Sequence, residues 1–514
     1  MHRFLQRHAQ KVIGVLSGFD RLVFRGTLRR IAYTAGLKSL LWDKKILFKD
    51  FSGFAQGLTA RLKEATCREA NLRERPIVYL PSSRTSKEEQ ARKIAERDGI
   101  EQGLIAVLSA VEPCRSFTVY RNRDEKKLEI RSRETKCLHF YHYAMDPFFG
   151  FLGARIQSWL PFSIQITVNG REWLSHALDR AGIAYHREGN CFPWIEDVEK
   201  AQKLLVHQLR VYLPRQLDRL ARMLNPDHGR MFRGDGLSHY WSVHQSEWAT
   251  DIMFNSPAAL AEVYPGLIRY AMTSIGSGEV MRFLGGKIGT VFQGEIVSDF
   301  KNRPVGVRVK HRVGGNSVKT YDKAGSILRT ETTINDAARL KVYRRKEGDP
   351  DGKPDWLPMR KGIADLHRRA EISQATNERY LDTLAAADTS QRVGDLLAKV
   401  SRRVKWKGRH ARALRPSDPV DLELFRLLAS GEFALHGLRN RDVQAVLYPE
   451  PTSDPKEKRR RGARATRLIR LLRAHRLLKK VPRSHRYQIT DRGKEIAAAV
   501  VTSQEATVQQ LAAA

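Results

Sequence analysis

The stretch RLIRLLRAHRLLKKVPRSHRYQITDRG, residues 467–493, carries the strongest structural signal in the chain. Leucines recur in it at the spacing of one helix face, which predicts a helix that packs on one side. The basic segment 479–490 that follows is typical of two short strands, and Asp491 begins a last helix. The stretch therefore predicts a helix, a two-stranded hairpin and a helix in that order. The apolar stripe consists of Leu468, Leu471, Leu472 and Leu478.

Two further amphipathic helices are predicted upstream, over 419–428 and 440–447, and the third helix begins at about residue 461. With the hairpin, this order resembles the winged helix-turn-helix domains that bind DNA. In that family a leucine-rich recognition helix is followed by a basic wing and a Tyr-x-Leu-Thr-x-x-Gly ending, to which residues 487–493 correspond. The resemblance implies that residues 417–514 form a DNA-binding domain.

The charge pattern of the third helix agrees with that family likeness. Four arginines recur every third residue on the face opposite the leucines, so one face packs while the other presents guanidinium groups to a groove. A solvated helix whose charges contact nothing is the alternative, but the wing adds a second basic element and favours DNA binding. The residues expected to contact DNA are Arg464, Arg467, Arg470 and Arg473 on the helix, and Arg483, His485 and Arg486 on the wing.

A third basic segment precedes this domain. Residues 399–416 contain eight Lys or Arg and no acidic residue, which predicts a flexible strap or a helix that lies on phosphates. Together with the recognition helix and wing, it holds 21 of the 35 net positive charges of the 514-residue chain. The expected phosphate contacts in the strap are Arg402, Arg403, Lys405 and Lys407.

The overall charge restricts the partner. With 91 Lys plus Arg against 56 Asp plus Glu, the chain favours a polyanion, so DNA is the expected partner and RNA the alternative. No apolar run reaches the roughly 18 residues that a membrane span needs, so no membrane partner is expected. The apolar residues 12–19 are interrupted at once by Asp20 and Arg21, which predicts a cytoplasmic protein without a signal peptide. A dimer is compatible with the sequence.

The cysteines are scattered along the chain. None of the four forms a CxxC pair, so neither a structural zinc site nor a disulfide framework is expected, in keeping with a reducing compartment. They are Cys67, Cys114, Cys137 and Cys191.

The rest of the chain predicts an α+β fold: a body with a mixed sheet and helical insertions over residues 1–345, a linker and basic helical strap over 346–416, and the C-terminal winged helix-turn-helix domain over 417–514. Strands are expected over 11–24, 116–122, 128–133, 136–144, 156–168, 291–299, 305–313, 317–321 and 327–334. Helices are expected over 86–97, 172–181, 195–224 and 257–284, with a Gly- and His-rich loop between the last two.

The strands between residues 308 and 335 carry the candidate chemistry. Side chains two residues apart share a face of a sheet, so Arg329 and Glu331 project together, as do Lys319 and Tyr321. A tyrosine on the same sheet as a carboxylate and cations has the groups needed to nick DNA: a phenolate attacks the phosphodiester while a metal and cations stabilise charge. His311 is a further catalytic candidate on these strands.

The pattern Lys-x-Tyr-Asp-Lys followed by Leu-Arg-x-Glu resembles rolling-circle replication initiators and filamentous-phage replication nickases. The resemblance implies that Tyr321 is the nucleophile, Lys323 its neighbouring cation and Glu331 a metal ligand with Arg329 beside it. The His-hydrophobe-His metal motif of the best-known nickases is absent, because two residues separate His139 from His142. An ordinary half-buried strand tyrosine is the alternative interpretation of Tyr321.

Asp20 is the second carboxylate of interest. It lies in an otherwise apolar predicted strand, so it needs either a basic partner or a metal ion. An early strand carboxylate joined by later ones is also how ribonuclease-H-like nucleases and transposases assemble a metal site for Mg²⁺ or Mn²⁺. The hypotheses are therefore a DNA strand nicking and joining enzyme of a mobile element or replicon, a two-metal nuclease using Asp20 and Glu331, and a non-enzymatic DNA- or RNA-binding regulator.

Overall fold

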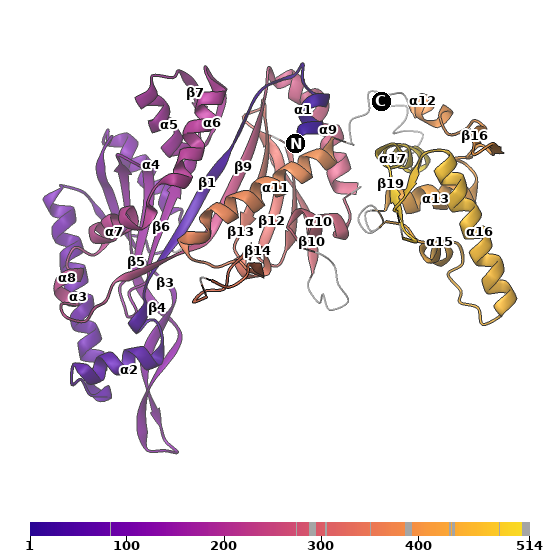
Figure 1. Cartoon of the computed structure of the whole chain (residues 1–514). Coiled ribbons are helices and arrows are strands. Elements are labelled where there is room, and N and C mark those ends of the chain that lie inside the picture. Colours follow the sequence, from indigo (N-terminus) through magenta and orange to yellow (C-terminus); the bar gives the residue numbers. More distant parts are fainter. Residues whose placement is uncertain are drawn as a thin grey trace. The chain divides into compact units, whose positions relative to one another are not determined.

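The computed structural model (Figure 1) describes residues 1–82, 84–273, 275–286, 295–303, 306–349, 351–385, 393–430, 433, 437–482 and 484–505. The fold is mixed α/β, built on an 11-stranded sheet, which confirms the coarse prediction of a mixed sheet with helices. The strand order in this sheet is β10-β11-β12-β13-β9-β1-β6-β5-β4-β3-β2. The chain divides into two compact units, one formed by residues 15–251 and 333–374 and the other by residues 1–14, 252–332 and 375–514.

In the unit formed by residues 15–251 and 333–374, side chains alternate between an apolar and a polar face of the sheet. Phe24 lies opposite Ile166 on one face, and both are buried. One residue further, Arg25 lies opposite Gln165, which in turn lies opposite Arg155, so these three polar side chains form a row on the other face. The strands are β1 (Val12–Leu28), β2 (Ile77–Tyr79), β3 (Gly103–Asn122), β4 (Lys127–Asp146), β5 (Gly150–Gln157) and β6 (Ile164–Asn169).

Local capping signals position the helices of this unit. Ser86 accepts a hydrogen bond from the Glu89 N–H and begins α4, and Asn169 accepts bonds from two N–H groups at the start of α5. Gly170 is required at that turn, because a Cβ there would lie 1.9 Å from the Phe19 carbonyl oxygen. The helices are α2 (Thr34–Asp43), α3 (Phe51–Leu72), α4 (Lys87–Arg97), α5 (Gly170–Ala181), α6 (Val198–His207), α7 (Leu213–Leu224) and α8 (His228–Met231), with short 3₁₀ turns η1 (Arg29–Ile31), η2 (Phe48–Asp50), η3 (Gln208–Arg210), η4 (Ala337–Arg339) and η5 (Ile363–Asp365).

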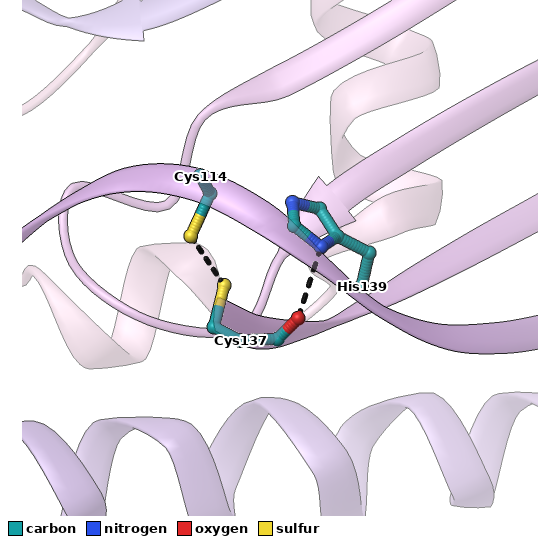
Figure 2. Close-up of side chains that lie close together, drawn as sticks. All are labelled: Cys114, Cys137 and His139. Atoms are coloured by element: carbon teal, nitrogen blue, oxygen red, sulfur yellow. Dashed lines mark hydrogen bonds between the residues drawn. The ribbon is translucent and has the colours of Figure 1, made fainter. Parts of the chain in front are cut away.

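Two hairpins also belong to this unit, β7 (Tyr185–Glu188) with β8 (Cys191–Ile195) and β14 (Lys341–Arg344) with β15 (Asp355–Pro358). The long hairpin of β3 and β4 makes neighbours of two cysteines that are well separated in the chain. It brings the sulfurs of Cys114 and Cys137 to 2.8 Å from one another, with His139 beside them (Figure 2). Two cysteines without CxxC spacing are therefore neighbours in the fold.

Strand β9 (His239–Phe254) lies where the sequence predicts a Gly- and His-rich loop. Trp241 and Val243 are both buried, and this alternation is the period-two signal of a strand. The strand matters for the site because it carries Glu247.

The other unit contains the hairpins predicted near Tyr321: β10 (Ile296–Arg303), β11 (Gly306–Val313), β12 (Asn316–Lys323) and β13 (Ile327–Ile334). The first four residues of the predicted strand 291–299 lie outside the described residues. Asn377 on α11 donates a hydrogen bond of 3.0 Å to the Thr330 carbonyl and so fixes that helix against β13. The helices are α1 (His2–Arg7), α9 (Pro257–Thr273) and α10 (Ser277–Phe283), together with α11 (Leu366–Leu384) from residue 375 onward.

The C-terminal part of that unit follows the predicted order of elements. Leucines of α16 pack with α13 and α17 around a shared apolar core, which includes Leu424, Leu468, Leu472 and Ile496. The elements are α12 (Val393–Ala398), β16 (Val404–Trp406), β17 (Arg409–Ala411), α13 (Pro419–Ala429), α15 (Asn440–Leu447), α16 (Pro455–Ala474), β18 (Leu478–Lys480), β19 (Tyr487–Ile489) and α17 (Asp491–Glu505).

The basic strap, expected as a flexible segment or a helix, contains a hairpin. Residues 404–411 form the hairpin of β16 and β17, because Lys407 and Gly408 adopt positive φ angles of 50° and 75° and reverse the chain. None of the described helices combines the length and the apolar character needed to cross a membrane.

Candidate functional site

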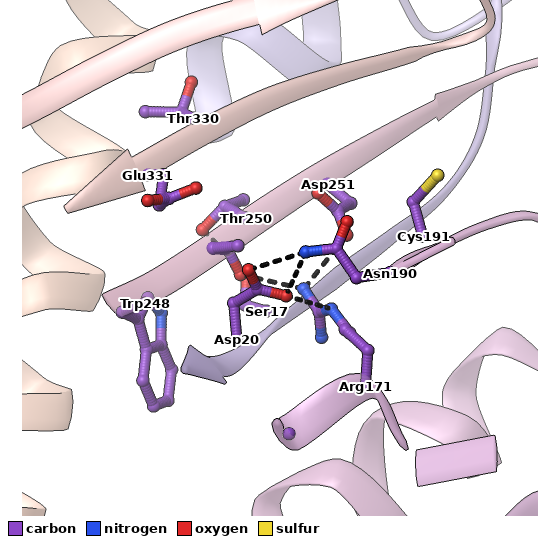
Figure 3. Close-up of polar contacts among 12 residues, drawn as sticks. Ser17, Asp20, Arg171, Asn190, Cys191, Trp248, Thr250, Asp251, Thr330 and Glu331 are labelled. Carbon is purple, nitrogen blue, oxygen red and sulfur yellow. Dashed lines mark hydrogen bonds and ion pairs between the residues drawn. The ribbon is translucent and has the colours of Figure 1, made fainter. Parts of the chain in front are cut away.

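Asp20 is held in a buried polar network of β1 (Figure 3). Its side chain is enclosed, and the Asn190 amide nitrogen donates to both carboxylate oxygens, at 3.0 and 2.8 Å. The Arg171 guanidinium lies 4.0 Å from Asp20 and 2.9 Å from Asp251. These contacts give the buried Asp20 carboxylate the partners that the sequence predicted it would require. They also fix the orientation of the carboxylate.

Asp20 and Glu247 line one cavity of about 650 Å³. Two more carboxylates lie on its wall, of which Glu172 is paired with Arg187 at 2.6 Å. The cavity therefore combines carboxylates with guanidinium groups, as a site for a phosphate ester and a cation requires. The charged residues of its lining are Asp20, Arg21, Glu88, Arg92, Arg155, Glu172, Arg187 and Glu247.

Two carboxylates of this cavity could bind a metal ion. Asp20 on β1 and Glu247 on β9 each offer one oxygen, and these two oxygens lie within 4.8 Å of one another. Their strands are neighbours in the sheet order β9-β1. Carboxylate oxygens are hard donors of the kind that Mg²⁺ and Mn²⁺ prefer, so the donor set fits a divalent cation. The sequence predicted Asp20 and Glu331 as ligands but missed Glu247, because strand β9 was not recognised.

Glu331 also joins two residues of the neighbouring strand β12. The Tyr321 hydroxyl donates a hydrogen bond of 3.1 Å to one carboxylate oxygen, and the Lys319 ammonium lies 2.7 Å from the other. Lys319 is also 5.4 Å from the centre of the Tyr321 ring. Lys323, the cation that the nickase resemblance implied, lies half-buried at the end of the same strand. Lys319 is therefore the cation that contacts the tyrosine and carboxylate pair.

Arg329 and His311 are both fully enclosed in the fold. The two imidazole nitrogens of His311 lie 2.7 Å from the Ser298 hydroxyl and 3.2 Å from the Tyr380 hydroxyl. Burial lowers the pKa of His311 to about 4, so the ring is neutral at physiological pH. These surroundings are typical of residues that support a core rather than of groups that face a substrate.

A second cavity of about 510 Å³ on the polar sheet face is strongly basic. Arg25, Arg115 and Arg155 all line it, and Arg155 is also paired with Glu112 at 3.3 Å. Burial, and then the charges of Arg155 and Arg115, lower the pKa of the Arg25 guanidinium. Bringing a phosphate group to this cavity would relieve the mutual repulsion of the three arginines.

Arginines and aromatic residues also gather on the C-terminal part of the chain. Arg464, Arg467 and Arg470 are exposed along α16 and line a hollow of about 960 Å³ with residues of the β16–β17 hairpin. Arg473 lies over the rings of Trp406 and Tyr487, with its guanidinium carbon 5.3 and 5.6 Å from their centres. The cations of this hollow are Arg412, Arg415, Arg460, Arg464, Arg467 and Arg470, with His410 beside them.

Arg483, another residue predicted to contact phosphate, lies outside the described residues. The remaining predicted phosphate contacts are all exposed. The exposed side chains are Arg402, Arg403, Lys405, Lys407, His485 and Arg486.

Comparisons with protein family models, with characterised proteins and with solved structures find no match to this chain.

Proposed function

We propose that the chain is a DNA-binding enzyme that cuts or joins a DNA strand with the help of Mg²⁺ or Mn²⁺. The observation that carries the proposal is the pairing of the Asp20 and Glu247 carboxylates, whose oxygens lie within 4.8 Å of one another and which line one cavity with several guanidinium groups. Such a group suits phosphodiester chemistry, because a divalent cation held by these carboxylates would polarise a phosphate oxygen and stabilise the charge that develops on it. A replication initiator or a transposase-like enzyme of a mobile element has this combination of activities.

The supporting residues around these carboxylates have separate tasks in the proposal. Asn190 and Arg171 orient Asp20, and Lys319 holds Glu331 through an ion pair. A bound metal ion would polarise the phosphate and lower the pKa of a water molecule beside it. Arg25 and Arg155 would bind the phosphates of the strand that flank the cleaved bond.

Tyr321 favours a covalent version of the reaction. Its hydroxyl donates to Glu331, so the carboxylate can accept the phenolic proton as the oxygen attacks phosphorus. The new bond joins the tyrosine oxygen to phosphorus, the bond to the sugar oxygen breaks, and that oxygen leaves as a hydroxyl after gaining a proton. Without this step, water would be the nucleophile and the enzyme would be a nuclease.

DNA binding is assigned in this proposal to residues 417–514, as a winged helix-turn-helix domain. Three features support it: the order of helices and strands, the exposed arginine row on α16 and the hairpin of β18 and β19. Helix α16 would contact the major groove, and the segment between β18 and β19 would contact the adjacent backbone. The basic β16–β17 hairpin would add phosphate contacts.

The test is cleavage of supercoiled plasmid by the purified full chain in the presence of Mg²⁺ or Mn²⁺. We expect a nicked product that disappears with a chelator and falls at least about a hundredfold in Asp20→Asn and Glu247→Gln. Glu199→Gln, which changes an exposed carboxylate on α6, is the matched control and should retain activity. No cleavage of duplex or single-stranded DNA, with tight binding intact, would leave the regulator hypothesis in place.

A further inference from the structure

The Cys114, Cys137 and His139 side chains form a compact group on the β3–β4 hairpin, within the unit that contains residues 15–251 (Figure 2). In the strand register Cys114 lies opposite Thr135, so Cys137 is its diagonal neighbour. His139 follows Cys137 by two residues and therefore shares its face of the sheet. One ligand atom from each of the three lies within 4.8 Å of the others.

The hydrogen bond of His139 leaves one nitrogen suited to a metal ion. Its Nδ1 atom lies 3.2 Å from the Cys137 carbonyl oxygen, and a carbonyl can only accept, so Nδ1 carries the proton. The Nε2 atom then has a lone pair. An imidazole that donates its other N–H to a backbone carbonyl is the usual arrangement of a metal-binding histidine.

Cys114 and Cys137 supply the other two donor atoms, and both side chains are only partly buried. Their sulfurs are 2.8 Å apart, longer than the roughly 2.05 Å of a disulfide bond, and both thiols are free. Cys114 and His139 line the basic cavity of about 510 Å³ described above. The group thus has protein on one side and an open cavity on the other, where a fourth ligand has room.

We propose that Cys114, Cys137 and His139 bind one zinc ion, with the fourth position open to the basic cavity. Two thiolates and an imidazole are soft and borderline donors, which select Zn²⁺ over the Mg²⁺ or Mn²⁺ expected at the carboxylate group. Each thiol releases its proton to solvent on binding, so the two negative charges of the thiolates balance the ion. Tetrahedral Zn–S bonds of about 2.3 Å place the sulfurs about 3.8 Å apart, so the thiols must separate by about 1 Å.

Zinc binding affects both the β3–β4 hairpin and the basic cavity. The ion joins β3 to β4 midway along the hairpin and so resists separation of the two strands. It also places a Lewis acid, with room for water or an anionic ligand, beside Arg25 and Arg155. This inference does not depend on cleavage activity, since zinc binding can be measured directly.

The test measures zinc in the full chain, purified under reducing conditions, loaded with Zn²⁺ and then dialysed. We expect one ion per chain by mass spectrometry of the metal, and an affinity reduced more than about a hundredfold in Cys114→Ser, Cys137→Ser and His139→Ala. Cys67→Ser, which changes the exposed cysteine on α3, is the matched control and should retain the ion. Circular dichroism checks that each variant is folded.

Cobalt substitution provides a second readout that does not rely on those variants being equally stable. Co²⁺ bound by two thiolates should give thiolate charge-transfer absorption that titrates to one equivalent in the unmodified chain. The proposal is overturned if the reduced chain binds no zinc, if Cys67→Ser and Cys137→Ser lose it equally, or if bound cobalt shows no thiolate absorption. A mass two hydrogens lower, with no zinc binding after reduction, would identify a disulfide pair instead.

Discussion

The Tyr321 hydroxyl lies 3.1 Å from a carboxylate oxygen of Glu331, and Lys319 lies 2.7 Å from the other oxygen of the same carboxylate. The carboxylate is enclosed by the fold, whereas the tyrosine is only half-buried. A phenol that donates to a buried carboxylate is oriented before any substrate arrives. This pair is the reason to distinguish covalent from hydrolytic cleavage by experiment.

Replacing Tyr321 by phenylalanine tests the covalent route. If the tyrosine oxygen attacks the phosphodiester, the unmodified chain should form a labelled DNA adduct that survives denaturing electrophoresis, and Tyr321→Phe should form none. Tyr343→Phe, at an exposed tyrosine of β14, is the control and should keep the adduct. Cleavage that persists in Tyr321→Phe while Asp20→Asn abolishes it would instead indicate a nuclease that uses water.

Replacing Arg171 tests whether its buried ion pairs hold the Asp20 network together. The guanidinium is fully enclosed and lies 2.9 Å from Asp251, so Arg171→Met removes the positive charge beside a buried carboxylate. We expect the free energy of unfolding to fall by about 3–5 kcal/mol in urea titrations. Arg180→Met, at an exposed arginine of the same helix, should change it by less than about 0.5 kcal/mol. Equal effects in the two variants would contradict the network.

The arginine row of α16 should govern how salt affects DNA binding. Each phosphate contact contributes about 0.9 to the slope of log affinity against log salt concentration. The double variant Arg467→Ala, Arg470→Ala should therefore lower that slope by about 1.8 in fluorescence anisotropy titrations with duplex DNA. Arg426→Ala, at an exposed arginine of α13, serves as the control. An unchanged slope in the double variant would exclude α16 as the phosphate-contacting helix.

His142 should make stability depend on pH. The ring is buried, and burial lowers its pKa to about 4 from the roughly 6.5 of an unfolded chain. Between those values the unfolded chain binds a proton that the folded chain excludes, so its contribution to stability is complete above pH 6.5 and is lost as pH falls towards 4. The loss from this group is about 3 kcal/mol.

Urea titrations across that pH range measure the effect. His142→Leu should flatten the decline, because the variant has no imidazole to protonate at this position. His207→Gln, at the exposed end of α6, should leave the decline unchanged. A decline as steep in His142→Leu as in the unmodified chain would show that other groups control it.

Local patterns predicted much of the secondary structure. The period of 3.6 in the leucines of α16 and the Ser86 cap of α4 are properties of a few consecutive residues, so both helices could be found from the sequence. The tight turns between β11, β12 and β13 likewise predicted that Tyr321 and Glu331 belong to one sheet. The charge of the strap predicted a flexible segment or a helix, whereas the turn at Lys407 and Gly408 makes residues 404–411 a hairpin.

The sequence by itself determined the order of the described helices and strands after residue 417, the basic character of α16 and the need of Asp20 for a polar partner, since each depends on nearby residues or on composition. Only the tertiary structure decided that Glu247 lies beside Asp20, and that Cys114 lies beside Cys137 and His139. The physical reason is strand pairing. Packing and hydrogen bonding across the whole sheet decide which strands become neighbours. No local sequence pattern therefore shows which distant residues come together.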